Sequence, residues 1–411
     1  EKYFKDSVST LNKGFLIHVG IDGFKMINEN YGWDYGDYIL RETASCILSC
    51  ISDSQKVYKI ASDEFIILDT TSSDMTTASN LYDHICKHIN QFIEENNFAA
   101  VFTISAGILP LPDLSQTGYA ELIKRTDFSL TMAKQHGRNC CYIFQEEEYQ
   151  NFLRIREITN ELHSAVNHSF RGFSIIFQPV MDIRQDKLTG AEVLIRFASK
   201  KFGPISPAEF IPLLETSGLI IPTGRWFMRE AITACRKIRM QIPDFKVNIN
   251  VSQVQITKSG VITDLISEMN ASGLPHTAIV IELTESILLE KNEKAQNFLK
   301  ELKQAGLQLA LDDFGTGYSN FHYLSELHPD IVKIDRGFTS KAITDKKEYY
   351  LLNQFSNMIH NLGLKLCIEG IETEDELQKI KLLKPDYCQG FYWGRPCSYD
   401  EFRKYFVDVK R

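Results

Sequence analysis

Along the first third of the chain, segments with the hydrophobic pattern of a strand alternate with segments that have the hydrophobic pattern of a helix. Apolar runs of strand length stand beside segments whose apolar positions recur as they do on one face of a helix. The strand-like runs are 15–19, 57–60, 65–68 and 98–108, and the helical segments are 38–51 and 81–93. A tight connection separates the second and third runs and predicts a hairpin. This mixture predicts an α+β domain over residues 1–145.

A charged, helix-prone stretch follows this first domain. Residues 145–149 read QEEEY, and His168–Gly172 interrupts the helical pattern. We interpret residues 146–170 as a linker helix between the domain 1–145 and a second domain, 171–411. A surface helix without a linking role is the alternative.

Beyond residue 171 the pattern changes to short apolar strands, each followed by a helical segment. The predicted strands are 173–182, 190–197, 246–252, 278–284, 307–313, 331–335, 365–369 and 387–392. Eight strands in about 240 residues predict a TIM-like (β/α)8 barrel, an α/β fold. An open, doubly wound parallel sheet is the competing architecture.

Composition narrows the classes of function. The 411 residues are 44% hydrophobic and 24% charged, as in ordinary globular proteins, and the net charge of -8 argues against a long nucleic acid as partner. The nine cysteines form no CxxC pair, so we expect reduced thiols in the cytoplasm and neither disulfides nor a zinc site. No apolar run reaches about 20 residues, so we expect no membrane contact here. The chain starts at Glu1, which suggests a fragment, and it could be the cytoplasmic part of a longer, membrane-anchored protein.

Acidic and amide side chains lie at or near the ends of the predicted barrel strands, where barrel enzymes carry their catalytic groups. On seven successive strands these positions hold Glu192 and Arg196, Asn250, Glu282, Asp312 and Asp313, Lys333, Glu369, and Gln389. Two bases cannot offset five converging carboxylates, so either some acids are protonated or divalent cations bind. An all-oxygen ligand set favours Mg²⁺ or Mn²⁺ over zinc, and a pair of such ions suits in-line displacement at phosphorus. Single acids of this kind are more often helix caps or loop ion pairs, but seven strands in succession are hard to explain in that way.

From about residue 150 onward the chain resembles the EAL-domain cyclic-di-GMP phosphodiesterases. The motifs that carry the likeness are FQP at 177–179, EVLIR at 192–196, NINVS at 248–252, ELTES at 282–286, DDFGTGYS at 312–319, KID at 333–335, EGIE at 369–372 and QGF at 389–391. The resemblance implies a TIM-like barrel with two Mg²⁺ or Mn²⁺ ions that hydrolyses cyclic di-GMP to linear pGpG.

The resemblance also implies roles for individual residues. The first metal would be held by Glu192, Asn250, Glu282 and Asp312, and the second by Asp312, Asp313 and Glu369. Glu369 would also lie near the attacking water.

Other positions would serve the substrate and regulation. Lys333 would orient the water and neutralise charge, Arg196 would clamp a phosphate, and Gln389 would support the site from the last strand. Glu285 resembles the glutamate that orders a loop between the dimer interface and the metals, so a homodimer through this domain is expected. Gln178 and Leu194 would line the substrate site.

Two positions depart from the family pattern. Val193 stands where the signature has alanine, and Ile368 stands where alanine is frequent. Val193 alternates with Glu192 along the strand and so faces the surrounding helices, where overpacking costs about 1–3 kcal/mol at most. Neither change removes a ligand, so we expect activity.

The first domain resembles a degenerate GGDEF, or diguanylate cyclase, domain. Its signature has become ASDEF at 61–65, and the added Cβ atoms obstruct the backbone approach to GTP phosphates that Gly-Gly permits. Gly20 replaces a metal-binding aspartate. We therefore expect no cyclase activity and a structural, dimerising or regulatory role, and leave open a vestigial GTP site at Asn28, Asp37, Asp63, Glu64 and Lys134.

Two alternatives to a simple phosphodiesterase remain. The barrel could be a receptor that binds cyclic di-GMP without hydrolysing it, although receptors of this kind usually lack ligands that are all present here. Alternatively, GTP bound to the first domain could activate the barrel allosterically.

Overall fold

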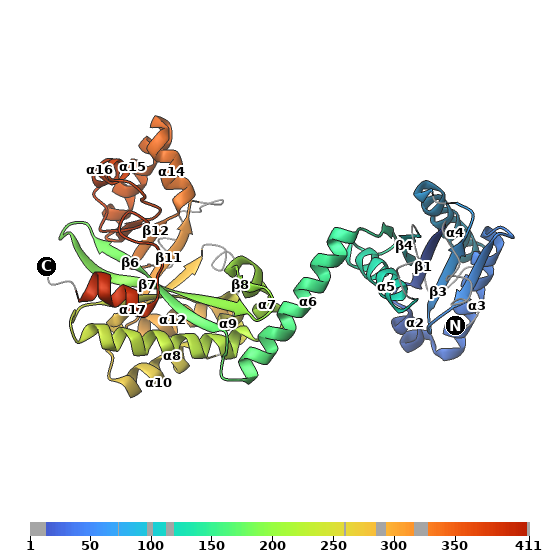
Figure 1. Ribbon diagram of the computed structural model, residues 1–411, viewed down its shortest axis with the longest axis horizontal. Coiled ribbons are helices and arrows are strands. Elements are labelled where there is room, and N and C mark those ends of the chain that lie inside the picture. Colours follow the sequence, from blue (N-terminus) through green and yellow to red (C-terminus); the bar gives the residue numbers. More distant parts are fainter. Residues whose placement is uncertain are drawn as a thin grey trace. The chain divides into compact units, whose positions relative to one another are not determined.

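The computed structural model describes residues 14–72, 74–96, 102–111, 119–258, 260–284, 293–315 and 328–408. The chain divides into two compact units, Glu1–Ile155 and Arg156–Arg411 (Figure 1). No helix among the described residues is both long enough and apolar enough to cross a membrane.

A five-stranded sheet with the order β2-β3-β1-β4-β5 forms the centre of the first unit. Its central strand is antiparallel to both neighbours, β2 and β3 form the predicted antiparallel hairpin, and β5 is parallel to β4. The strands are β1 (Phe15–Ile21), β2 (Gln55–Lys59), β3 (Glu64–Asp69), β4 (Ile104–Pro110) and β5 (Cys141–Ile143), and the helices are α2 (Phe24–Tyr31), α3 (Trp33–Cys50), α4 (Met75–Glu95) and α5 (Tyr119–Gln135).

Helices cover both faces of this sheet, which explains why every residue of β1 is buried. Ile17 points into the core formed with α3 and α4, whereas its neighbour Leu16 joins a second cluster with Leu122 of α5. Alternate residues of a strand lie on opposite faces, so His18 and Gly20 share the α5 face with Leu16. The predicted α+β organisation is confirmed, and residues 98–101 of the predicted strand at 98–108 lie outside the described part.

The second unit is a barrel, as predicted. Its sheet has the order β6-β14-β13-β12-β11-β10-β9-β7-β8, and pairing between β6 and β7 closes the ring of eight strands, leaving β8 outside it. The strands are β6 (Phe173–Asp182), β7 (Lys187–Ser199), β8 (Gly203–Ile205), β9 (Lys246–Asn250), β10 (Ile279–Thr284), β11 (Gln308–Phe314), β12 (Ile331–Ile334), β13 (Lys365–Ile368) and β14 (Tyr387–Gln389).

The first barrel strand differs from a regular (β/α)8 barrel. β6 is antiparallel to both β7 and β14, whereas the pairs from β7 and β9 through to β14 are parallel. Only residues 183–186 join β6 to β7. A parallel connection needs a dozen or more residues, so this short link forces a hairpin.

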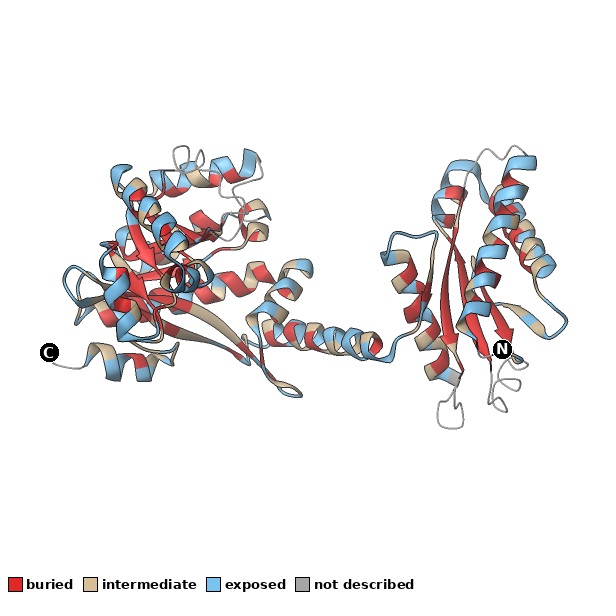
Figure 2. Cartoon of the chain, turned by 90° about the horizontal axis from the view of Figure 1, so that it is seen from above, coloured by how far each residue is buried: buried red, intermediate tan, exposed pale blue. Residues whose placement is uncertain are grey.

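Helices surround the barrel and bury the outward-facing side chains of its strands. Val193, Ile249 and Ile281 belong to one continuous core that includes residues of α8, and the buried strands of both units are red in Figure 2. The helices are α7 (Pro207–Thr216), α8 (Ile220–Arg239), α9 (Gln253–Lys258), α10 (Val261–Ser272), α12 (Glu293–Gln304), α14 (Arg336–Thr344), α15 (Lys346–Asn361), α16 (Glu374–Lys381) and α17 (Tyr399–Phe402), with a 3-10 turn η1 (His276–Ala278) and a π turn η2 (Arg403–Val407).

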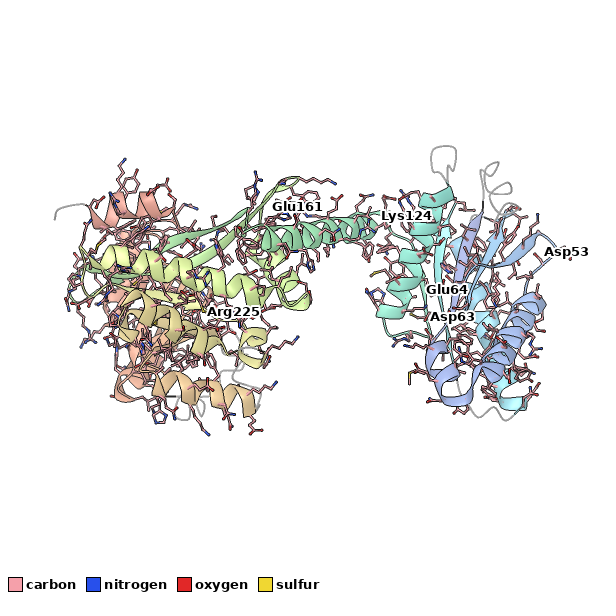
Figure 3. All side chains as sticks on the ribbon, turned by 90° about the horizontal axis from the view of Figure 1, so that it is seen from below. Asp53, Asp63, Glu64, Lys124, Glu161 and Arg225 are labelled. Carbon is pink, nitrogen blue, oxygen red and sulfur yellow. The ribbon has the colours of Figure 1, made fainter. Side chains whose placement is uncertain are left out.

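A long helix, α6 (Glu146–Asn167), occupies most of the predicted linker, and the division between the two units falls within it. In the second unit, its Glu161 accepts hydrogen bonds from Ser199 Oγ and the Lys200 amide (Figure 3). Ile158 and Leu162 are buried against the end of the barrel that carries β8 and α7. The exact domain boundaries remain a prediction.

We predict that Val193→Ala lowers the free energy of unfolding by about 1–2 kcal/mol, because two buried methyl groups are lost from a side chain with no exposed surface. Urea denaturation measures this change. An unchanged or higher stability would mean instead that valine strains the packing at this position.

Candidate active site

A buried lysine lies at the centre of an acidic cluster at the carboxyl ends of the barrel strands. Lys333 of β12 is 1% exposed, and its Nζ lies 2.7 Å from Glu282 Oε1 on β10. The same nitrogen lies 3.0 Å from Asp312 Oδ1 on β11 and 2.8 Å from Glu369 Oε1, directly after β13. Glu192 Oε2 on β7 is 3.6 Å away. The tertiary structure thus brings residues from five strands around one ammonium group.

The cluster carries more negative than positive charge. Four carboxylates face a single ammonium group, which leaves three formal negative charges in a site with little water. Burial raises the pKa of Glu282 well above its usual range, although Lys333 opposes this shift. Burial and the charges of Asp312 and Glu192 raise the pKa of Glu369 to about 7, again against the opposing effect of Lys333. Burial alone would lower the pKa of Lys333, but the four carboxylates raise it well above its usual value.

Side-chain amides hold the carboxylates in place. Asn250 Nδ2 donates to Glu192 Oε1 at 2.9 Å and to Glu282 Oε2 at 3.2 Å, which leaves its Oδ1 available to a cation. Asn248 Nδ2 donates to Glu282 Oε1 at 2.8 Å, and Gln389 Nε2 donates to Glu192 Oε2 at 2.6 Å. These bonds fix the orientation of Glu192 from β9 and β14 and that of Glu282 from β9, so little reorganisation is needed when a ligand binds.

Asp313 lies at an irregularity of β11 that strand periodicity does not predict. Neighbouring residues of a regular strand point to opposite faces, which would separate Asp312 from Asp313. Here the register between β11 and β12 shifts between Leu311 and Phe314, and Asp313 has a φ of 56°, in the left-handed region. Burial and the nearby charges of Asp312 and Asp335 raise the pKa of Asp313. Strained backbone of this kind is frequent at functional sites.

The donor set fits hard divalent cations. Carboxylate oxygens of Glu192, Glu282 and Asp312 all lie within 4.8 Å of one another. Gln389 Oε1 is a buried oxygen that receives no hydrogen bond in the described part of the chain, whereas Asp312 Oδ1 and Glu369 Oε1 face the Lys333 ammonium. Oxygen ligands with surplus negative charge suit Mg²⁺ or Mn²⁺ better than zinc.

Two pockets adjoin the acidic cluster. One, of about 240 Å³, is lined by the predicted substrate-site residues Gln178 and Leu194 together with Glu192, Glu369 and Gln389. The other, of about 630 Å³, lies between β7, α7, α8 and the end of β9, and its lining residues include Leu194, Arg196 and Asn250.

Arg196 lies at the edge of this second pocket. Its Nη1 donates to the Ile195 carbonyl at 2.8 Å, and burial lowers its pKa. Its side chain is half-buried, so its charge is only partly screened by water.

Sequence reasoning missed roles for two residues. Asn248, two positions before Asn250 on the same strand face, braces Glu282, and this spacing could have revealed it. Arg336 lines the smaller pocket, pairs with Glu372 and lies 5.8 Å from the centre of the Phe391 ring. Its position directly after KID at 333–335 was the available signal. The predicted regulatory residue Glu285 lies outside the described residues.

In the first unit, the degenerate signature is engaged in internal ion pairs. Glu64, at the start of β3 beside Asp63 (Figure 3), lies 3.2 Å from His18 Nε2 and 3.7 Å from Lys134 Nζ. His18 is 1% exposed, and its Nδ1 lies 3.3 Å from Asp127 Oδ1. Burial lowers the pKa of His18, but Asp127 and Glu64 raise it by more, so the net shift is upward.

The other residues of the predicted vestigial site lie on nearby helices. Asn28 is half-buried on α2, and a Cβ built on Gly36 would lie 1.8 Å from its Oδ1. Asp37 is exposed on α3. A Cβ at Gly20 would meet Lys134 Nζ at 3.0 Å, so Lys134 occupies the space beside the missing aspartate.

Comparison with known proteins identifies the family. The EAL domain model matches residues 159–396, and the model described as "Diguanylate cyclase, GGDEF domain" matches residues 2–140. The chain belongs to the EAL domain family. A GGDEF domain precedes its EAL domain, as the sequence motifs predict.

Curated relatives match nearly the whole of this chain with part of a longer chain of their own. The bifunctional diguanylate cyclase/cyclic di-GMP phosphodiesterase MucR of Pseudomonas aeruginosa is 29% identical over 93% of this chain and 55% of its own length. The cyclic di-GMP phosphodiesterase PdeR of Escherichia coli is 27% identical over 96% of this chain and 59% of its own. This chain therefore spans a little over half the length of these relatives.

Among solved structures, the "PaMucR Phosphodiesterase, c-di-GMP complex" is similar to the EAL part. It is 29% identical, covers 60% of this chain and 99% of that chain, and has a TM-score of 0.55. The structure thus relates the barrel to a phosphodiesterase solved with its nucleotide.

We predict that Lys333→Met destabilises the metal-free protein by about 3–5 kcal/mol, because it leaves buried carboxylates without their counter-charge. Urea unfolding in the presence of a chelator measures the loss. Lys300→Met, at an exposed position of α12, serves as the control and should change stability by less than about 0.5 kcal/mol. Equal effects of the two substitutions would contradict the central role of Lys333.

We also predict that Mg²⁺ or Mn²⁺ raises the melting temperature more at pH 8 than at pH 6. The folded, metal-free site keeps a proton on Glu369 up to a pKa of about 7, whereas the unfolded chain releases it near 4.5. This group therefore destabilises the metal-free fold as the pH rises between these values, and a cation must displace the proton at pH 6 but not at pH 8. Calorimetry with and without metal checks this, and equal gains at both pH values would contradict it.

Proposed function

We propose that the EAL domain of this chain hydrolyses cyclic di-GMP to linear pGpG with two bound divalent cations, and that the GGDEF domain before it has no cyclase activity. The observation that carries the proposal is the convergence of Glu192, Glu282, Asp312 and Glu369 around Lys333. The relatives named as cyclic di-GMP phosphodiesterases support the choice of substrate.

The acidic and amide residues of the cluster around Lys333 would hold the two cations in the arrangement that the motifs imply. Bound there, such ions lower the pKa of water and stabilise both oxygens of an in-line displacement at phosphorus. Their proposed ligands are Glu192, Asn250, Glu282 and Asp312 for the first ion, and Asp312, Asp313 and Glu369 for the second.

The chain's own residues orient the reactants and manage charge and protons. Glu369 would lie near the attacking water, where its carboxylate can accept a proton from that water. Lys333 keeps its proton and offsets negative charge as the water oxygen bonds to phosphorus and the bond to the 3′ oxygen breaks. Arg196 has a half-buried guanidinium group that suits a substrate phosphate.

Two lines of observation support the loss of cyclase activity in the first unit. The position of a metal-binding aspartate is Gly20, next to which Lys134 lies. Glu64 of the ASDEF signature is engaged by His18 and Lys134. The regulatory or dimerising role of this unit, GTP binding to it, and a homodimer through the EAL domain stay predictions.

The decisive experiment incubates the purified chain with cyclic di-GMP and either Mg²⁺ or Mn²⁺ and detects pGpG by chromatography. We expect turnover with the unmodified chain and a loss of at least about a hundredfold in Glu282→Gln, because one cation loses a carboxylate ligand. Glu301→Gln, at an exposed position of α12, is the control and should keep full activity.

The same samples distinguish an enzyme from a receptor. Calorimetric binding of cyclic di-GMP without any product, under both metals, would replace the phosphodiesterase proposal with a non-hydrolysing receptor. A rate that rises when millimolar GTP is added would favour GTP activation through the first unit.

We predict that GTP and Mg²⁺ or Mn²⁺ yield no cyclic di-GMP, and no pGpG derived from it, with a Glu282→Gln chain that cannot remove the product. The reason is the absent ligand at Gly20 and the Cβ atoms at Ala61 and Ser62. Accumulation of cyclic di-GMP in this assay would contradict the assignment of a dead cyclase.

A further inference from the structure

Two helices of the first unit bring a thiol and two imidazoles together, away from the signature residues. Cys50 ends α3, and His84 and His88 lie one turn apart on α4, which packs against α3 in the same core. One ligand atom from each of the three residues lies within 4.8 Å of the other two. Three soft or borderline donors thus surround one point in the first unit.

The two imidazoles are held beside each other. Their ring centres are 4.7 Å apart and their planes meet at 85°. Within the described part of the chain, no side-chain hydrogen bond or ion pair engages either ring. His84 is exposed, whereas His88 and Cys50 are half-buried, so an ion could enter from solvent and still be partly enclosed.

The surroundings of the Cys50 thiol are compatible with a role as a metal ligand. Burial raises the pKa of Cys50 and of Cys46, one turn earlier on α3, and the charge of Cys50 raises that of Cys46 further. Cys50 Sγ contacts Ser49 Oγ at 3.9 Å, too weakly to compete with a metal. A cation that binds the sulfur would replace the thiol proton. Its positive charge would stabilise the thiolate and so offset the free-energy cost of ionising Cys50 in a half-buried position.

We propose that Cys50, His84 and His88 form a zinc-binding site that ties the end of α3 to the middle of α4. Sulfur and imidazole ligands select zinc and similar transition metals over Mg²⁺ and Mn²⁺, and two histidines four residues apart on a helix present their nitrogens to one ion. Water completes the coordination, since Cys46 does not belong to the group of atoms within 4.8 Å. This site is independent of the chemistry proposed for the barrel.

The proposal departs from the expectation drawn from cysteine spacing. The chain has no CxxC pair, and Cys50 stands 34 and 38 residues before the two histidines. Only the packing of α3 on α4 brings them together. In a helical pair, such a metal restrains the relative position of the two helices, much as a disulfide restrains the segments that it joins.

The test titrates cobalt, a spectroscopic substitute for zinc, into the reduced, metal-free full chain. We expect a thiolate-to-cobalt charge-transfer band in the near ultraviolet, at one equivalent, which zinc then abolishes. Cys50→Ser should lose this band, and His84→Asn with His88→Asn should weaken cobalt binding at least about tenfold. The oxygen ligands of the barrel give no thiolate band, so cobalt bound there does not interfere.

Matched controls separate the site from general thiol chemistry. Cys46→Ser, one turn earlier on α3, and Cys86→Ser, between the two histidines on α4, should keep the band. Circular dichroism and unchanged pGpG production should show that Cys50→Ser is folded and active in its barrel. Absence of the band in the unmodified chain, or its persistence in Cys50→Ser, would overturn the proposal, whatever the outcome of the phosphodiesterase assay.

Discussion

The ion pairs of Lys333 are the constraint on which the barrel site depends. Three carboxylate oxygens lie within 3.0 Å of one buried ammonium group, and a fourth is 3.6 Å away. Without that charge, the acids would repel one another in a site with little water, and the fold would have to protonate them or open. Lysine supplies only one of the charges required, so the site keeps a surplus of negative charge that suits further cations. Stability and metal binding are therefore two aspects of the same electrostatic imbalance.

The surrounding amides and the strained strand end turn this imbalance into a defined geometry. Asn248, Asn250 and Gln389 each donate to a carboxylate and prevent it from rotating towards solvent. The register shift around Asp312 and Asp313 interrupts the regular alternation of β11 at its end, at the cost of a left-handed residue. A rigid barrel can sustain such strain because its hydrogen-bonded strands extend around the site.

The first unit resolves a similar electrostatic problem differently. Its Glu64 has two internal cationic partners, His18 and Lys134, and Asp127 pairs with the same histidine. A buried acid that is neutralised by protein side chains has less need of a metal. The barrel keeps a deficit of positive charge, whereas the signature end of the first unit supplies its own.

Local sequence determined the strands and the motifs at their ends. The predicted apolar runs coincide with the barrel strands to within a few residues, because period and turn residues act over short distances. Placement of Glu192, Glu282, Asp312 and Glu369 in one cluster followed from the motif likeness and the rule that barrel strands end at one face. The antiparallel β6, the bulge at Asp313 and the meeting of Cys50 with two histidines came only from the tertiary structure. Each of these features depends on how segments distant in the sequence pack against one another. The local pattern of hydrophobic and polar residues does not predict such contacts.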